Sequence, residues 1–265
     1  MKQQKTGPVT IVTGASKGIG AAIVQELHDR GYRLALMSPS GASTALAKKL
    51  GHVGQDGSIE HSADIHKLVT HALETYGAVH NVVINTPRSM DILRSTGTDP
   101  AQYTSPTRQA VTYDPDFRPD IAGMPVAVWR RCFDLHVASV IEIASVVTPH
   151  LIRSGGGAIL NISGIDASEP RQTYALGPIR LSLHGYSKLY ADRYAADKIR
   201  MNCLALGFLE NAMSKDPGFV QVIPAARYGS LAEAAKIAAF LLSDDASYIT
   251  GQVITADGGL NRGVR

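Results

Sequence analysis

Three glycines with the spacing of a phosphate-binding turn lie near the start of the chain, at Gly14, Gly18 and Gly20. They follow a β-branched apolar run at residues 9–12 and precede a segment with apolar residues at helical spacing. Glycines at a strand-to-helix turn let the backbone approach a pyrophosphate, whose charge then rests on the N-terminus of the helix. The turn therefore predicts dinucleotide binding through Gly14, Ser16, Lys17, Gly18, Ile19 and Gly20.

The end of the second expected strand indicates which dinucleotide binds. An acidic side chain there would bind the ribose hydroxyls and repel a 2′-phosphate. Residues 36–40 carry no carboxylate, and Ser38 stands where that acid would be. Lys17 adds a cation within the glycine turn, unless it points into solvent. We therefore expect NADP(H) in preference to NAD(H).

The glycine turn, read as TGxxxGxG, resembles the short-chain dehydrogenase/reductase family of the classical type, and other segments carry the same resemblance. Asn85 takes the place of the second Asn of the family's NNAG motif, and Asp64 that of its adenine-binding Asp after the third strand. The tail at residues 248–252 and 257–259 is close to the family's C-terminal signature. The resemblance covers nearly the whole chain and implies cofactor contacts from Ser38, Asp64, Ile65, Asn85, Arg180, Gly207 and Leu209.

The same resemblance implies a catalytic tyrosine with a lysine four residues later, and this chain departs from that YxxxK motif. The lysine is needed because an ordinary phenol titrates near ~10 and is a poor base at neutral pH. Here Lys188 has His184 four residues before it. A crossover helix that begins at residue 177 places Arg180 at the lysine position and Leu176 at the tyrosine position. Lys188 is then expected on the surface.

Other residues therefore become candidates for catalysis. The serine position falls on Gly164 when counted along the fifth strand and on Ser163 when counted back from Arg180. Tyr174 is either the acid or a wall of the substrate pocket, and His136 replaces the helical Asn that holds a relay water in many members. Arg180 can hold a ribose but cannot release a proton near neutrality. The candidate catalytic residues are Ser163, Tyr174, Arg180 and His136.

Short β-rich runs that alternate with longer amphipathic segments must position these residues. Strands are expected at residues 9–13, 33–37, 57–63, 79–85, 158–162, 200–205 and 253–255, and helices at 19–30, 42–50, 65–76, 127–152, 177–196 and 231–242. One helix between successive strands implies a Rossmann-type α/β fold, a doubly wound parallel sheet with helices on both faces. Without internal repeats or linkers, one domain over residues 1–265 is predicted.

One segment interrupts this alternation. Residues 86–125 contain six prolines over about 40 residues, whereas connections longer than about 12 to 15 residues are uncommon in compact domains. The segment leaves the carboxyl edge of the sheet, where open α/β sheets bind ligands. We expect either a lid or substrate wall, or a solvated insertion with no role.

Composition argues against several classes of partner. The chain has 26 Lys and Arg against 23 Asp and Glu, a net charge of +3 without blocks of like charge, which disfavours nucleic acid and anionic membranes. Cys132 and Cys203 lie in apolar stretches without metal-ligand spacing, as buried thiols in a reducing cytosol do. We expect no membrane-spanning helix, no metal, and a cytoplasmic homodimer or homotetramer that pairs through the helices at 127–152 and 177–196.

The leading hypothesis is an NADP(H)-dependent oxidoreductase that reduces a carbonyl group or an activated double bond of a small molecule. Two alternatives are open: a redox-silent dinucleotide-binding scaffold or regulator, and a non-redox enzyme, such as a dehydratase or cyclase, that uses the same pocket. The intact cofactor motifs favour the first hypothesis, and the missing YxxxK motif favours the other two.

Overall fold

Seven parallel strands form the sheet, in the order β3-β2-β1-β4-β5-β6-β7. The computed structural model describes residues 6–103, 117–169, 175–212 and 218–263. The strand order reverses between β1 and β4, so the predicted doubly wound, Rossmann-type fold is confirmed. The strands are β1 (Val9–Thr13), β2 (Arg33–Ser38), β3 (Val53–Asp56), β4 (Asn81–Asn85), β5 (Gly157–Gly164), β6 (Ile199–Leu206) and β7 (Val253–Ala256).

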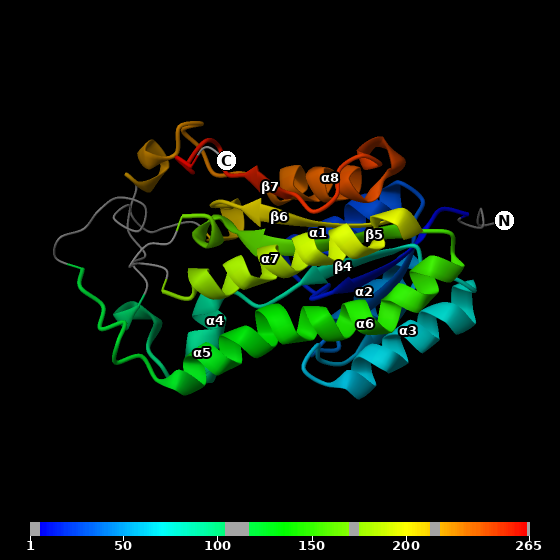
Figure 1. Cartoon of the computed structure of the whole chain (residues 1–265), viewed down its shortest axis with the longest axis horizontal. Coiled ribbons are helices and arrows are strands. Elements are labelled where there is room, and N and C mark those ends of the chain that lie inside the picture. The colour runs from blue at the N-terminus through cyan, green and yellow to red at the C-terminus, as the bar shows by residue number, and fades with distance from the viewer. Residues whose placement is uncertain (1–5, 104–116, 170–174, 213–217, 264–265) are drawn as a thin grey trace.

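Helices cover both faces of the sheet (Figure 1). On one face the core is formed with α1 (Gly18–Asp29), α2 (Ala42–Leu50) and α8 (Leu231–Leu242). On the other it is formed with α3 (Ser62–Tyr76), α6 (Ser139–Arg153) and α7 (Gly177–Tyr194). Central strands such as β1 are buried along their whole length, because helices lie on both sides of them.

A glycine at the start of α7 lets this helix lie close to the sheet. The helix opens with Gly177 followed by proline, which needs no N–H partner in the first turn. A Cβ at Gly177 would overlap the carbonyl oxygen of Asp166, so glycine is needed for this approach. The first turn of α7, which carries Arg180, is thereby held beside the carboxyl end of β5.

The third strand differs from its prediction. It lies at Val53–Asp56, where it pairs with the end of β2, and not at residues 57–63. The expected segment instead turns toward α3, and the Ser58 N–H donates to the Asp64 carboxylate at 2.9 Å. Asp64 therefore lies in the first turn of α3 and does not directly follow a strand.

The segment at residues 86–125 contributes to the core. It contains α4 (Ser89–Ser95), whose Ile92 and Leu93 are buried with Tyr103 and with Val128 of α5 (Val126–Phe133). The described part of the segment is therefore not a solvated insertion, while residues 104–116 lie outside the described residues. α4 lies at the end of the molecule to which the strand arrows point (Figure 1).

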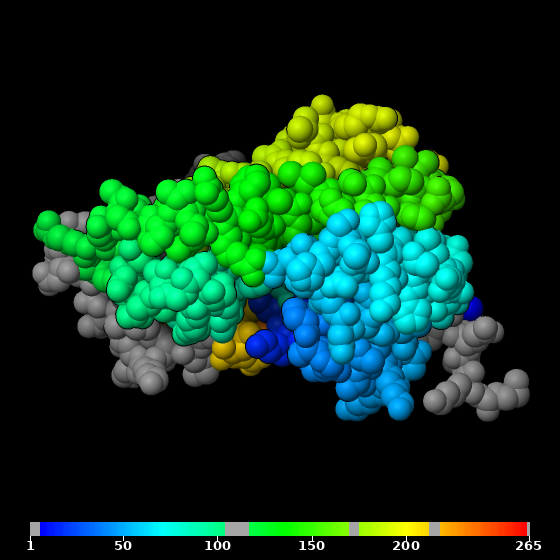
Figure 2. All heavy atoms as spheres, turned by 90° about the horizontal axis from the view of Figure 1, so that it is seen from below, coloured from blue at the N-terminus to red at the C-terminus, as the bar shows by residue number. Residues whose placement is uncertain are grey.

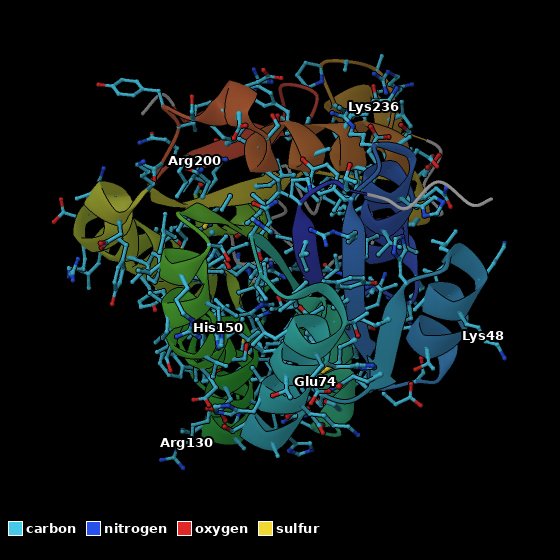
Figure 3. The ribbon with its side chains drawn as sticks, turned by 90° about the vertical axis from the view of Figure 1, so that its right-hand side faces the viewer. Lys48, Glu74, Arg130, His150, Arg200 and Lys236 are labelled. Atoms are coloured by element: carbon cyan, nitrogen blue, oxygen red, sulfur yellow. The ribbon has the colours of Figure 1, made fainter. Side chains whose placement is uncertain are left out.

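The helix expected at residues 127–152 is two helices, α5 and α6, joined by a π-helical turn at Asp134–Ala138. By length and composition alone, the combined run Val126–Arg153 could cross a membrane. Its most apolar window is 56% buried against the rest of the protein, as in a core helix. Charged side chains such as Arg130 on this run and Glu74 on α3 project outward from the helical layers (Figure 3).

Candidate functional site

The glycine turn between β1 and α1 adopts a conformation that requires its glycines. Gly14 and Gly18 have φ angles of +60° and +55°, in the left-handed region that glycine enters without strain. A Cβ at Gly20 would overlap the carbonyl oxygen of Gly14, so glycine lets α1 start this close to the turn. Lys17 at the N-cap makes no side-chain capping bond, which leaves the first N–H groups of α1 for an anion.

Asn85 at the end of β4 holds this turn in place. Its side-chain Nδ2 donates to the carbonyl oxygen of Gly14 at 3.0 Å, and its backbone N–H donates to Thr13 Oγ1 at 3.1 Å. Asn85 is thus a positioning residue for the turn, and its direct contact with a cofactor stays a prediction.

Viewed from below, the surface is hollowed between the α4 side and the α2 side of the molecule, with N-terminal residues (dark blue) at the floor of the hollow (Figure 2).

Two further predicted cofactor residues lie on α3. Asp64 uses its carboxylate to hold the turn at Ser58. Ile65 is 2% exposed and packs in the core on the α3 side of the sheet, and its contact with a cofactor stays a prediction.

The ends of β2 and β6 carry the other predicted cofactor residues. Ser38 is buried, and its hydroxyl donates to the carbonyl oxygen of Ser40 at 3.1 Å. Gly207 packs so closely that a Cβ there would lie 2.6 Å from Cβ of Asp257. Leu209 is buried and forms an isolated β-bridge with Gly229.

Lys17 is exposed and belongs to a group of cations at the mouth of the glycine turn. Arg88 and Arg94 both pair with Asp91 on α4, at 3.0 Å and 3.3 Å. Although burial acts to raise it, the pKa of Asp91 is lowered by the hydrogen bond and charge of Arg88 and by the charges of Arg94 and Lys17. Three cations against one carboxylate make this edge of the site attractive to anions.

Arg180, at the position expected for the lysine, is buried beside the end of β5, with 9% of its surface exposed. Its Nε lies 3.6 Å from Asp166 Oδ2, an ion pair too long for a hydrogen bond. Nε has no hydrogen-bond partner among the residues that the structure describes. A Cβ at Gly164 would overlap the Asp166 carboxylate, so the glycine makes room for this ion pair.

Ser163 points to a different neighbour. Its buried hydroxyl lies 2.8 Å from Nε2 of His184, one helical turn beyond Arg180 on α7. A Cβ built on Gly164 lies 3.9 Å from Cζ of Arg180, so Gly164 is the residue of β5 that faces the guanidinium. The geometry favours the count along the strand, which places the family's serine position at Gly164.

His136 lies in the π-helical turn and is fully buried. Its Nδ1 is 2.7 Å from Thr86 Oγ1, and its Nε2 has no hydrogen-bond partner among the described residues. Burial, reinforced by the charge of Arg180, holds the pKa of His136 well below its usual range, so the imidazole is neutral at pH 7. Turns of this kind are frequent at functional sites.

Neither Leu176 nor Lys188 nor Cys132 supplies a reactive group to the site. Leu176, at the expected tyrosine position, is buried in the apolar cluster that also holds Leu93. Lys188 is exposed on α7, as predicted. Burial raises the pKa of Cys132 to about 12, so this thiol is not a nucleophile at neutral pH. Tyr174 lies outside the described residues.

Sequence reasoning missed Asp166 and Thr86. Both are polar residues just beyond the carboxyl end of a strand, since Thr86 follows β4 and Asp166 follows β5. That position was the available signal, because carboxyl ends of parallel strands meet at one edge of the sheet.

The site can be compared with known proteins. A family model described as short chain dehydrogenase matches residues 8–103, and one described as Enoyl-(Acyl carrier protein) reductase matches residues 109–261. Dehydrogenase/reductase SDR family member 4 of Caenorhabditis elegans is 30% identical, over 96% of this chain and 95% of its own. The 3-oxoacyl-[acyl-carrier-protein] reductase FabG of Chlamydia trachomatis is 28% identical, over 94% and 96%.

Two more similarities extend over the whole fold. The granaticin polyketide synthase putative ketoacyl reductase 2 of Streptomyces violaceoruber is 30% identical, over 95% of both chains. The solved structure of TT0495 protein from Thermus thermophilus superposes with a TM-score of 0.76 and 28% identity, covering 96% of this chain and 99% of that one. With the glycine turn, the strand order and the placement of α7, these matches establish that the chain belongs to the short-chain dehydrogenase/reductase family.

Proposed function

We propose that this member of an oxidoreductase family binds NADP(H) at the carboxyl edge of its sheet and reduces a small-molecule carbonyl compound or activated alkene. The observation that carries the proposal is the glycine turn, in which a Cβ at Gly20 would fill the space next to Gly14 and the first N–H groups of α1 lack a side-chain cap. A pyrophosphate fits such a turn because its oxygens accept hydrogen bonds from these N–H groups.

Particular residues would hold each part of the cofactor. The glycine turn would hold the pyrophosphate, and the α4 cations with Lys17 would attract a 2′-phosphate. Gly207 at the end of β6, which packs closely against Asp257, would lie near the nicotinamide. When bound, the reduced nicotinamide supplies a hydride. Relatives named as ketoacyl reductases support a carbonyl substrate, and the family model named for enoyl reductase supports an activated double bond.

Calorimetric titration with NADP(H) and NAD(H) tests the proposal directly. Tight binding of NADP(H), followed by loss of NADPH absorbance with aldehydes, ketones or enones, is the expected result. A protein that binds neither dinucleotide contradicts it.

A second function is favoured by one observation: the cation at the lysine position is partly neutralised by Asp166. A redox-silent dinucleotide-binding regulator would keep the turn and need no proton donor. Dinucleotide binding without turnover of any aldehyde, ketone or enone tested would support this function over the first.

Replacing Ser38 by aspartate should turn the cofactor preference toward NAD(H). A carboxylate at the end of β2 would repel the 2′-phosphate, and a like-charge contact costs several kcal/mol, so the ratio of the two affinities should change by about 10- to 100-fold. The neutral Ser38→Asn variant is the matched control. Tighter NAD(H) binding by the unmodified protein would overturn the assignment.

The protein is also proposed to be a cytoplasmic homodimer or homotetramer. Leu181 and Leu189 on α7 and Ile141 and Ile152 on α6 are exposed, with Leu189 67% accessible. Tyr190, also on α7, is buried within the chain, and its hydroxyl lies 2.5 Å from Thr148 Oγ1, so it is not part of this exposed surface. The two buried thiols are consistent with a reducing compartment.

Light scattering at micromolar concentration should give at least twice the mass of one chain. Leu189→Glu should lower that mass, because a charge would be buried at an apolar contact. Ile121→Glu, at an exposed position outside both helices, should leave it unchanged. A monomeric wild-type protein would contradict the assembly.

A further inference from the structure

Two buried nitrogens at the carboxyl edge lack the hydrogen bonds that buried polar groups normally make. Arg180 Nε is too far from Asp166 for a hydrogen bond, and His136 Nε2 has no partner among the described residues. Arg180 has 9% of its surface exposed and His136 is fully buried, and the Arg180 charge acts on His136. Two unsatisfied groups whose side chains interact electrostatically point to a bound acceptor, because each group costs about 1–3 kcal/mol when left without a partner.

The tautomer of His136 decides whether it can donate to that acceptor. When the Thr86 hydroxyl donates to Nδ1 across 2.7 Å, the ring proton is on Nε2. The imidazole is neutral, and a neutral imidazole polarises an oxygen without transferring a proton readily. Arg180 likewise donates a hydrogen bond but does not release a proton near neutrality.

We propose that Arg180 Nε–H and His136 Nε2–H together bind the oxygen of an α,β-unsaturated carbonyl substrate and stabilise it as an enolate. This inference rests on the proposed function and deepens it by choosing between its two substrate classes. Donors that hold negative charge but do not protonate it suit an enolate, which survives as an intermediate. They do not suit an alkoxide, a far stronger base that must take a proton as it forms.

The reaction balances with a reduced nicotinamide dinucleotide and water. The hydride forms a C–H bond at the β-carbon, the alkene electron pair becomes the new double bond to the carbonyl carbon, and the carbonyl pair moves to oxygen. Arg180 and His136 hold that oxygen. Water then gives a proton to the α-carbon, the carbonyl group re-forms, and the dinucleotide is left oxidised.

The Ser163–His184 pair is the rival proton source among the described residues. Both side chains are buried, and the Ser163 hydroxyl is directed at His184 beneath α7. Gly164, which faces Arg180, has no side chain to deliver a proton. This arrangement separates the hydroxyl from the guanidinium and favours charge stabilisation over proton donation.

Binding of 4-nitrophenolate, a stable analogue of an enolate oxygen, tests the two-donor site without turnover. Absorbance titration of the protein, with and without NADP⁺, should show preferential binding of the ionised form. In the absence of cofactor, Arg180→Gln should weaken phenolate binding about 10- to 100-fold, the loss expected for a hydrogen bond to a charged group. Asp166→Asn should strengthen it, because the carboxylate no longer competes for the guanidinium.

Arg193→Gln is the matched control, since this exposed arginine lies at the other end of α7 and pairs with Asp197 as Arg180 pairs with Asp166. It should leave phenolate affinity unchanged. If Arg180→Gln does not fold, the Asp166→Asn variant still tests whether Arg180 binds the oxygen. If the ion pair had only a structural role, breaking it would not make the protein bind phenolate more tightly. Unchanged affinity in both variants overturns the inference.

The product formed from cyclohex-2-enone gives a second readout. With NADPH in D₂O, the expected product is cyclohexanone with deuterium at the α-carbon. Formation of cyclohex-2-enol would overturn the inference and leave the proposed function intact. If the wild-type protein binds no dinucleotide, the proposed function is wrong. The phenolate titration without cofactor would still test whether Arg180 and His136 bind an oxygen anion.

Discussion

Replacing Gly18 by valine should weaken NADP(H) binding about 100-fold, the loss of roughly one hydrogen bond to a charged group. The residue has a φ of +55° at the start of α1, where a side chain would stand in the space of the pyrophosphate. Within the protein itself a Cβ would meet only Nδ2 of Asn211, at 3.0 Å. The fold should therefore survive with a strain of about 1–3 kcal/mol. Calorimetry measures the affinity and thermal unfolding checks the fold.

Gly185→Ala is the matched control for this experiment. Gly185 lies within α7 with no atom within 4 Å of a Cβ built on it. Alanine there should leave dinucleotide affinity unchanged and stabilise the helix by up to about 1 kcal/mol. A Gly18→Val protein that binds NADP(H) as tightly as the wild type would show that the turn is not the phosphate site.

Replacing Leu93 by alanine should lower the free energy of unfolding by about 2–5 kcal/mol, the range for large-to-small changes in a packed core. Leu93 is 1% exposed on α4 and packs with Val128, Cys132 and Leu176. Urea unfolding of the two proteins measures the difference. The same packing means that removing residues 90–118 would take Ile92, Leu93 and Tyr103 out of the core, so that a deletion would unfold this edge and not merely abolish turnover.

Met90→Ala provides the comparison within the same helix, because Met90 is only partly buried. Its expected effect is well below that of Leu93→Ala. Equal and small losses from both variants would mean that α4 does not belong to the core.

The parts of the fold that the sequence predicted well are those with strong local patterns. β1 is an unbroken buried apolar run, and α8 is a regular amphipathic segment that opens with a capping box at Ser230 and Glu233. β3 was misplaced because only Gln55 of its four residues is buried, which leaves no apolar alternation to detect. α4 was missed because prolines at 87 and 100 suggested an irregular segment, whereas they flank the helix without interrupting it.

The candidate site was predictable only in part. The glycine turn could be identified because its spacing is local, and Arg180 could be placed by counting along one helix. The bond between Thr86 and His136 joins residues 50 positions apart, and it depends on a π-helical turn that no local pattern indicated. The same holds for Ser163 and His184, which meet only when α7 packs on β5.

The interdependence of Gly164, Asp166 and Arg180 makes the site epistatic. A serine at residue 164 would meet the Asp166 carboxylate, so this carboxylate would have to shift away from its place beside Arg180. Replacing Asp166 or Arg180 by a neutral residue leaves a buried charge without its counterion, a loss of up to about 3–5 kcal/mol. A laboratory lineage selected to regain a family-type lysine keeps the cation opposite Asp166, whereas one selected to regain the serine must first move this carboxylate, so we expect the lysine to return before the serine.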